Sequence, residues 1–355
     1  MNLRFTLPVI FAFIFQIGFV VDAEAQDPRF SQFYAAPMQL NPAMTGVFEG
    51  RWRFNANYRD QWRSILETDP FQTVAASFDM RYHIVGDDFI GFGFSALRDE
   101  AGTSKFNINR GHLSLSYMKQ VGGGKYRTDD QYLIAGGSFG FGQNSIDDQL
   151  WFSKQYNGNT NAPDFGQSSG EAFDTVDPQS SDIYTDVNAG LMYYALFGKN
   201  TSVYVGGAMN HLNAPNVSLL ENGKEELYTR WLGHAGGEIP FTTELSLLPA
   251  VQVMGQGPSF ESTFGANIRF SNHDWYELAI RAGLWARMTN TVEGKNVDAL
   301  IVAFILEVEK WNLGLSYDIT TSNLNEANDS RGAFELSLIY THPAQSRIKV
   351  NCPKF

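Results

Sequence analysis

Hydrophobic and polar residues alternate along much of the chain beyond residue 50. In segment 51–59 the even positions hold apolar or aromatic residues, and the odd positions hold arginine or asparagine. The same alternation recurs nearer the end of the sequence, at 260–270, 276–287 and 334–341. A repeat of two residues is typical of β-strands that have one apolar and one polar face. The pattern therefore predicts an all-β protein.

Breaks in the alternation and turn residues divide the sequence into about fourteen strands. Twelve or sixteen strands would also fit, because three of the segments alternate poorly. The predicted strands are 51–62, 71–83, 89–98, 107–120, 130–144, 184–198, 201–213, 226–238, 243–255, 259–271, 275–288, 297–309, 311–320 and 332–342. An even number of antiparallel strands is typical of bacterial outer-membrane β-barrels.

The links between these strands are short after the even-numbered strands and often long after the odd-numbered ones. The long links lie at 145–183, 214–225, 289–296 and 321–331. Transmembrane barrels have short periplasmic turns and longer external loops. A soluble β-sandwich also alternates, but it has no reason to place its long loops at one end. We therefore predict a transmembrane antiparallel β-barrel over residues 50–343, with both ends of the chain in the periplasm.

The first 25 residues have the pattern of a cleaved secretory signal peptide. The basic residue Arg4 precedes an apolar run at 5–21, and a site of small residues follows it. We expect cleavage near Ala25–Gln26, and an uncleaved anchor helix is the alternative. Beyond this point no apolar run approaches the roughly 18 residues that a spanning helix needs. A protein of this kind that enters the outer membrane must therefore cross it as a barrel.

Composition narrows the classes of function. The net charge of −12 argues against nucleic acid as a partner, because phosphate binding needs a basic surface. The six histidines are scattered, without the close spacing of a zinc site, and neither a Gly-x-Ser-x-Gly elbow nor a phosphate-binding glycine loop is present. We expect no enzymatic activity, no metal and no cofactor. An outer-membrane lipase or protease is the weaker alternative, on grounds of fold alone.

The long link at 145–183 is the most distinctive insertion. It contains seven acidic residues and one basic residue, Lys154, with aromatic residues between them. It is either a solvated surface loop or an external surface for a partner protein. Ordering by Ca²⁺ is a further possibility, since clustered carboxylates suit that ion, although the spacing of an EF-hand is absent. The candidate partner-binding residues are Trp151, Phe152, Tyr156, Asp164, Phe165 and Phe173.

The polar face of the first strand carries basic residues that we expect in the lumen or at its rim. These lumen residues are Arg51, Arg53 and Arg59, and Arg63 continues the series. They could attract an anionic substrate. Alternatively, they pair with acidic residues that face them from other strands, such as Glu261, Glu277 and Glu335. The interpretation as ion pairs is the one we favour.

Four motifs near the ends of the chain resemble a known family. They are DPRFSQFY at 27–34, LNPA at 40–43, YRDQW at 58–62 and CPKF at 352–355. Together they closely resemble the opening and the ending of the PorP/SprF family of the Bacteroidetes. The last motif contains the only cysteine, Cys352, which could pair with another chain or pack as a free thiol against the mouth of the barrel.

The resemblance implies an outer-membrane barrel of the type IX secretion system, associated in some members with gliding motility. The implied partners are a secreted cell-surface protein, held through its type IX C-terminal signal domain, and other components of the secretion system, together with outer-membrane lipids. The alternative is a porin or channel for small solutes, closed by an N-terminal plug.

Segment 26–49 is too rich in aromatic residues for a free tail and too rich in proline for a regular strand or helix. We predict that it forms a plug inside the barrel or across its periplasmic mouth, leaving no open pore. The alternative is a disordered leader. The expected plug residues are Phe30, Phe33, Tyr34, Asn41 and Pro42. The predicted organisation is a signal peptide at 1–25, the plug at 26–49, the barrel at 50–343 and a periplasmic tail at 344–355.

Overall fold

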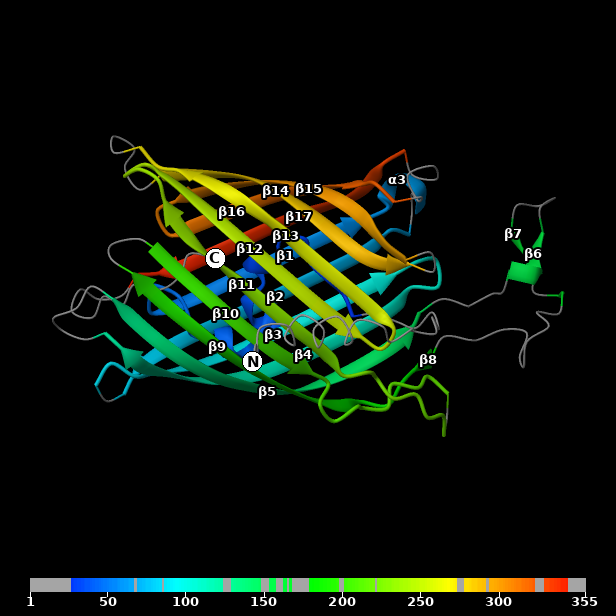
Figure 1. The fold of residues 1–355 in the computed structure, drawn as a ribbon. Coiled ribbons are helices and arrows are strands. Elements are labelled where there is room, and N and C mark those ends of the chain that lie inside the picture. The colour runs from blue at the N-terminus through cyan, green and yellow to red at the C-terminus, as the bar shows by residue number, and fades with distance from the viewer. Residues whose placement is uncertain are drawn as a thin grey trace, which may run out of the picture.

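Fourteen antiparallel strands close into a β-barrel in the computed structural model (Figure 1). Each strand pairs with its neighbours in the sequence, and the last strand pairs with the first to close the ring. The structure describes residues 27–66, 69–84, 86–123, 129–147, 153–157, 162–164, 166–167, 179–197, 201–220, 222–272, 278–291, 294–322 and 329–343. Within this part of the chain, no helix has the length and apolar character that crossing a membrane requires.

The barrel strands follow the alternation of the sequence closely. They are β1 (Trp52–Gln61), β2 (Phe71–His83), β3 (Phe89–Ala101), β4 (Phe106–Gly122), β5 (Asp130–Ile146), β9 (Tyr184–Phe197), β10 (Thr201–Asn210), β11 (Arg230–Pro240), β12 (Leu245–Gln256), β13 (Ser259–Phe270), β14 (Leu278–Thr291), β15 (Gly294–Val308), β16 (Trp311–Thr320) and β17 (Arg331–His342). A short strand, β8 (Gln179–Ser180), pairs only with the end of β5. The predicted fold and its fourteen strands are confirmed.

The largest difference from the predicted strands is at β11, which begins four residues later than expected. Residues 211–229 form a folded loop instead. In this loop the backbone N–H of Val217 donates to the carbonyl of Glu225 at 2.8 Å, and an isolated β-bridge joins Asn216 to Glu226. Residues 226–229 therefore belong to the loop, although their composition resembles that of a strand.

The two faces of each strand have opposite polarity. In β16 the side chains of Leu313, Leu315 and Tyr317 are exposed on the outside, whereas Ser316 and Asp318 are buried inside. The outer face of a membrane barrel meets lipid, so its apolar side chains remain exposed in the protein alone. A polar interior then needs partners for its charges. This requirement determines what can fill the barrel.

The two ends of the barrel differ in their connections. One end has the short turns 84–88, 241–244 and 309–310, and the other carries the long links 147–183 and 211–229. Because bacterial barrels have short periplasmic turns and long external loops, we call these the periplasmic and the external end. The pairing of β1 with β17, here called the seam, begins at the periplasmic end, where β1 starts and β17 stops.

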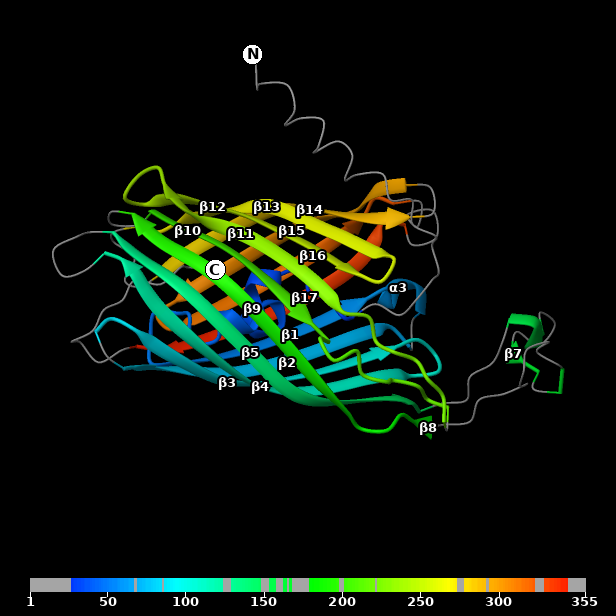
Figure 2. The same ribbon diagram turned by 60° about the horizontal axis from the view of Figure 1, so that its bottom comes forward.

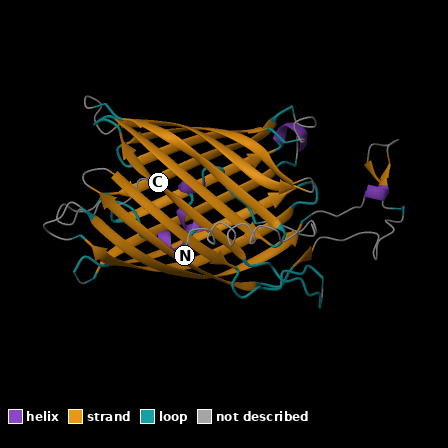
Figure 3. Cartoon of the chain, viewed as in Figure 1, coloured by secondary structure: helices purple, strands orange, loops and turns teal. Residues whose placement is uncertain are grey.

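Residues 27–50, here called the plug, run inside the barrel (Figures 2 and 3). The plug contains three short helical elements: η1 (Phe33–Ala35), α2 (Pro37–Leu40) and η2 (Pro42–Met44). The side chains of Met44 and Val47 are fully buried between the plug and the wall. At Gly136 of β5, a Cβ would lie only 2.5 Å from the Cα of Ala43, so the close approach of η2 to the wall requires glycine there.

Other short elements lie in the external links. They are α3 (Arg63–Leu66), between β1 and β2, and, in the link between β5 and β9, η3 (Ser153–Gln155), β6 (Tyr156–Asn157) and β7 (Ala162–Pro163).

The outward face of β16 provides a test of the lipid-facing assignment. Leu315, in the middle of the strand, is 45% exposed, and Leu212, in the loop after β10, is 43% exposed. We expect Leu315→Arg to lower the free energy of unfolding by about 2–4 kcal/mol, the cost of a cation near the bilayer midplane. Leu212→Arg, the matched control, should change it by less than about 0.5 kcal/mol. Guanidinium unfolding in lipid vesicles, followed by tryptophan fluorescence, measures both. Equal effects would contradict the lipid-facing assignment of β16.

Candidate functional site

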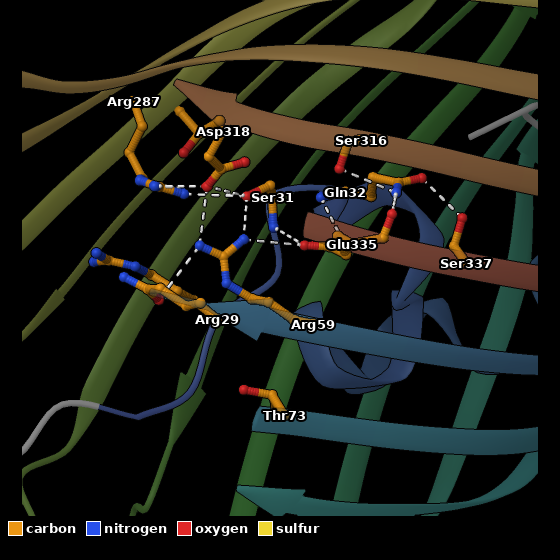
Figure 4. A network of polar contacts seen from close by, with 12 residues as sticks. Arg29, Ser31, Gln32, Arg59, Thr73, Arg287, Ser316, Asp318, Glu335 and Ser337 are labelled. Carbon is orange, nitrogen blue, oxygen red and sulfur yellow. Dashed lines mark hydrogen bonds and ion pairs between the residues drawn. The ribbon is translucent and has the colours of Figure 1, made fainter. Parts of the chain in front are cut away.

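The carboxylate of Glu335 in β17 holds the plug where it passes the seam (Figure 4). The backbone N–H groups of Ser31 and Gln32 donate to its two oxygens at 2.7 and 2.9 Å. Arg59 of β1 donates to the same carboxylate at 3.2 Å. Glu335 and Arg59 are both fully buried. A buried charge is costly unless it is paired and hydrogen-bonded, so this carboxylate requires both the arginine and the plug.

A second carboxylate, Asp318 of β16, extends this arrangement. Its Oδ2 atom accepts hydrogen bonds from Arg59 at 2.9 Å, from Arg287 of β14 at 2.8 Å and from the Ser31 hydroxyl at 2.9 Å. The Ser31 oxygen in turn accepts from Arg59 at 2.5 Å and from Arg287 at 3.1 Å. One small hydroxyl of the plug therefore lies at the centre of two arginines and a carboxylate. We call Ser31, Gln32, Arg59, Arg287, Asp318 and Glu335 the seam network.

The side chain of Gln32 completes the attachment with neutral hydrogen bonds. Its amide nitrogen donates to the Ser316 hydroxyl at 3.2 Å, and its amide oxygen accepts from the Ser337 hydroxyl at 2.8 Å. These two serines lie on β16 and β17. The plug is therefore bound by backbone and side chain to three neighbouring strands on both sides of the seam.

A second buried cluster, the Asp27 network, binds the start of the plug on the opposite wall. The Asp27 carboxylate lies 2.6 Å from Nη1 of Arg110, 2.6 Å from Nε2 of His211 and 3.3 Å from Nη1 of Arg230. The other ring nitrogen of His211, Nδ1, lies 2.9 Å from Asp186 in β9. Here the plug supplies the carboxylate and the wall supplies the basic side chains. At Glu335 the wall supplies the carboxylate and the plug supplies hydrogen-bond donors.

The surroundings of Asp27 and His211 shift both pKa values in favour of the charged forms. Burial alone would raise the pKa of Asp27, but the charges of Arg110, Arg230 and His211 hold it well below its usual value. Burial would lower the pKa of His211, but the charge of Asp27 and the hydrogen bonds that the imidazole makes to the carboxylates of Asp186 and Asp27 raise it instead. Both shifts favour an ion pair between Asp27 and His211.

Asn41 connects the centre of the plug to a third part of the wall. Its Oδ1 accepts from the backbone N–H of Ala43 at 2.8 Å and so caps η2. Its Nδ2 donates to the carbonyls of Leu191 in β9 and Gly207 in β10, both at 3.2 Å. Pro42 occupies the first position of η2, where no backbone donor is needed. The Asn-Pro pair therefore starts the helix and fixes it to two strands.

The arginines predicted for the lumen have different locations. Arg53 and Arg59 are buried inside, and Arg53 pairs through two nitrogens with Asp79 of β2, at 2.8 and 3.0 Å. Arg53 also donates to the carbonyls of Met44 and Val47 in the plug. Arg51 is exposed at the strand end, one residue before β1 begins, so of the two predicted locations it lies at the rim and not deep in the lumen. Arg63 is exposed beyond the end of β1 and pairs with Asp60.

The acids expected to face these arginines are only partly those observed. Glu335 pairs with Arg59 as predicted, whereas Glu261 pairs with Arg29 of the plug. Glu277 lies outside the described residues. The interior arginines Arg53 and Arg59 are therefore neutralised by carboxylates rather than left free for an anionic substrate.

Five residues were expected in the plug: Phe30, Phe33, Tyr34, Asn41 and Pro42. All lie within residues 27–50 inside the barrel; Phe30 is half-buried and the other four are buried. Phe33 and Tyr34 pack against Trp285 of β14, with ring centroids 5.6 and 5.4 Å away. Burial raises the pKa of Tyr34, whose ring lies deep among these aromatic groups.

Most of the residues expected to bind a partner lie outside the described part of the chain. These are Trp151, Phe152, Phe165 and Phe173. The signal peptide at 1–25 and the tail at 344–355, with Cys352, also lie outside the described residues. Tyr156 belongs to β6, and Asp164 is half-buried, with its Oδ1 accepting from the N–H of Gly166 at 3.0 Å. Among the described residues, no group of three or more acidic, histidine or cysteine side chains is placed to hold a metal ion.

The sequence did not single out the polar residues that attach the plug to the wall. Asp27, Ser31 and Gln32 lie in the DPRFSQFY motif, but only its aromatic residues were predicted to be buried. Asp318 and Arg287 occupy inward positions of alternating strands, so the two-residue repeat could have indicated that their charges need partners inside. A cavity of about 60 Å³ remains beside Asp27 and Phe33. It has room for a few water molecules at most.

Comparisons with known proteins identify the family of the chain. The model of the family described as "Type IX secretion system membrane protein PorP/SprF" matches residues 22–340, and the chain therefore belongs to this family. No curated protein matches the sequence.

Several solved outer-membrane barrels are similar in structure. A TodX monoaromatic hydrocarbon channel is 11% identical with a TM-score of 0.49, covering 86% of this chain and 92% of its own. The Ralstonia pickettii toluene transporter TbuX is 11% identical with a TM-score of 0.45, covering 88% and 94%. A Pseudomonas aeruginosa FadL homologue is 11% identical with a TM-score of 0.44, covering 84% and 92%.

Removal of the charge at Glu335 should both release the plug more easily and lower the stability of the barrel. Glu335→Gln leaves Arg59 without one of its two buried carboxylate partners, so we expect the free energy of unfolding to fall by about 3–5 kcal/mol. Glu100→Gln, which breaks the exposed pair with Arg98, should cost no more than about 1 kcal/mol. Guanidinium unfolding gives both values, and limited proteolysis reports release of the plug. Similar effects of the two changes would contradict the role of Glu335.

The Asp27 network predicts weaker plug binding at alkaline pH. The folded pKa of His211 lies above 6.5, so its contribution to stability is complete below pH 6.5 and is lost as the pH rises through the raised value. The pKa of Asp27 is lowered from 3.8, so its contribution is present above pH 3.8 and is lost only in stronger acid. Unfolding between pH 5 and 10 should show the alkaline loss in the wild type. His211→Gln should lack that loss, and its persistence in this variant would contradict the assignment.

Proposed function

We propose that this PorP/SprF protein is a closed outer-membrane scaffold that holds a secreted cell-surface protein at its external end, through the C-terminal signal domain of that partner. In this role the barrel does not conduct solutes and catalyses no reaction. The chain belongs to a family of type IX secretion system membrane proteins. The proposal adds a specific role to that membership. The observation that carries it is the attachment of the plug by buried ion pairs.

The attachment of the plug favours a rigid scaffold over a gated channel. Movement of the plug out of the lumen would separate Asp27 from Arg110 and Arg230, and it would remove two backbone donors from Glu335. Each buried charge that loses its partner costs about 3–5 kcal/mol. A plug that opened readily for a small solute would need polar contacts that water can replace when the plug moves.

The loop at 211–229 supports external binding, because it is ordered and presents apolar groups. The Asn216 side chain donates to the carbonyl of Gly223 at 2.8 Å and accepts from the backbone N–H of Glu225 at 2.8 Å. Leu220 and Tyr228, on the same loop, are exposed. A preformed loop with exposed apolar side chains binds a partner at a lower cost in conformational entropy than a loop that orders on binding.

Affinity capture from detergent-solubilised outer membrane tests the proposal. We expect the tagged wild-type protein to recover a large secreted protein with a type IX C-terminal domain. Leu220→Ser should reduce this recovery about fivefold to tenfold, since an apolar anchor at an interface contributes about 1–1.4 kcal/mol or more. Deletion of residues 148–178 should reduce it further if the link at 147–183 also contributes.

Phe241→Ser is the matched control for this capture. Phe241 is an exposed apolar residue in a turn at the periplasmic end, so its replacement should leave recovery unchanged. Recovery of the barrel alone, together with open-channel conductance of the wild type in planar bilayers, would overturn the proposal and favour a solute channel.

A further inference from the structure

The external end of the seam carries an arginine on the outer wall of the barrel. In β17 the odd-numbered residues Ala333, Glu335 and Ser337 face the interior. The register between β16 and β17 shifts by one residue between Tyr317 and Ile319, which is a β-bulge. Beyond the bulge, Arg331 pairs with the outward-facing Ile319 and is itself exposed. The bulge therefore turns a charged side chain towards the outer surface.

The start of the first external link brings a second arginine to the same place. Trp62 adopts a left-handed backbone with φ 60°, which is rare for a bulky residue, and its N–H donates to the carbonyl of Gly332 at 3.0 Å. This turn starts α3, which lies at the external end beside β17 (Figure 1). Arg63, the first residue of α3, consequently lies over the outer end of the seam.

A cavity of about 470 Å³ opens on this outer face. Its polar end is formed by Arg63, Arg331, Ser64 and Asp60, and its apolar wall by the exposed rings of Tyr317 and Phe334. Below these rings the outer face of the seam continues as exposed leucines towards the periplasmic end, at Leu315, Leu336 and Leu313. The site is therefore cationic at the membrane surface and apolar within the membrane.

Among the described residues that line the site, one acidic and two basic side chains leave one net positive charge. Arg63 pairs with Asp60, its Nε lying 2.6 Å from Oδ2, and the same oxygen accepts from the Tyr58 hydroxyl at 3.0 Å. No ion pair joins Arg331 to any residue that the structure describes. A cation that no described residue neutralises, at the edge of a lipid-facing wall, is suited to an anionic headgroup, and the planar guanidinium matches phosphate well.

We propose that this outer site binds a phosphate-bearing lipid of the external leaflet. The phosphate lies against Arg331 and Arg63, and an acyl chain follows the rings of Tyr317 and Phe334 along the seam. A lipid is the occupant that fits both ends of the site, because the apolar part lies on the membrane-facing wall and the arginines lie at the level of the headgroups. The proposal does not depend on the protein partner at the external loops.

Native mass spectrometry of the full mature protein in detergent provides the test. The probe is lipid A with its phosphates, compared with the same lipid after removal of the phosphates. We expect tighter binding of the phosphorylated form. Arg331→Gln should weaken that binding about fivefold, and the double change with Arg63→Gln should weaken it by roughly tenfold or more. Arg331→Gln is the decisive variant, because it breaks no ion pair among the described residues.

Arg98→Gln is the matched control. Arg98 lies at the same end of the barrel, and its side chain is 56% exposed, as is that of Arg63. It pairs with Glu100 and lies away from this cavity, so its replacement should leave lipid binding unchanged. Heat-dependent migration in gels confirms that each variant remains a folded barrel. Equal binding of the two lipids, or equal loss in Arg98→Gln and Arg331→Gln, would overturn the proposal.

Discussion

A buried charge must have a partner, and this constraint determines the interior of the barrel. The inner wall carries Glu335 and Asp318 near Arg59, and it carries Arg110 and Arg230 on the opposite side. The wall does not balance these charges alone. The plug adds two backbone donors and a hydroxyl where the wall has carboxylates, and a carboxylate where it has arginines. The plug is therefore the complement of the wall and not merely a filling for its volume.

Further hydrogen bonds attach the plug to the wall at other places. Arg53 bonds to two carbonyls of the plug, and Asn41 joins the plug to β9 and β10. Contacts of this kind on several strands must break together before the plug can move. The external links are not part of these contacts, and loops carried on a wall of this kind are common places for binding sites.

The strands could be predicted from the sequence because inward and outward positions alternate along each strand. The polarity of each residue therefore indicates which face it occupies, without knowledge of the rest of the fold. The pairing of Arg59 with Glu335 was within reach, since these residues lie directly opposite each other across the seam. The pairing of Asp27 with His211 was not, because the plug has no repeat that fixes its path. For Arg51 the sequence left two locations open, the lumen and its rim, because the alternation continues past the strand end.

The hydrogen bond between Ser31 and Glu335 joins positions 304 residues apart, near the two ends of the chain. Its acceptor lies on β17, the last strand, whose pairing with β1 closes the ring. The binding place of the plug is therefore complete only when the ring closes. Folding must therefore bring the earliest and latest segments together before the plug is fully bound, and such long-range contacts form slowly. During biogenesis, the interior is completed only once β17 has paired with β1.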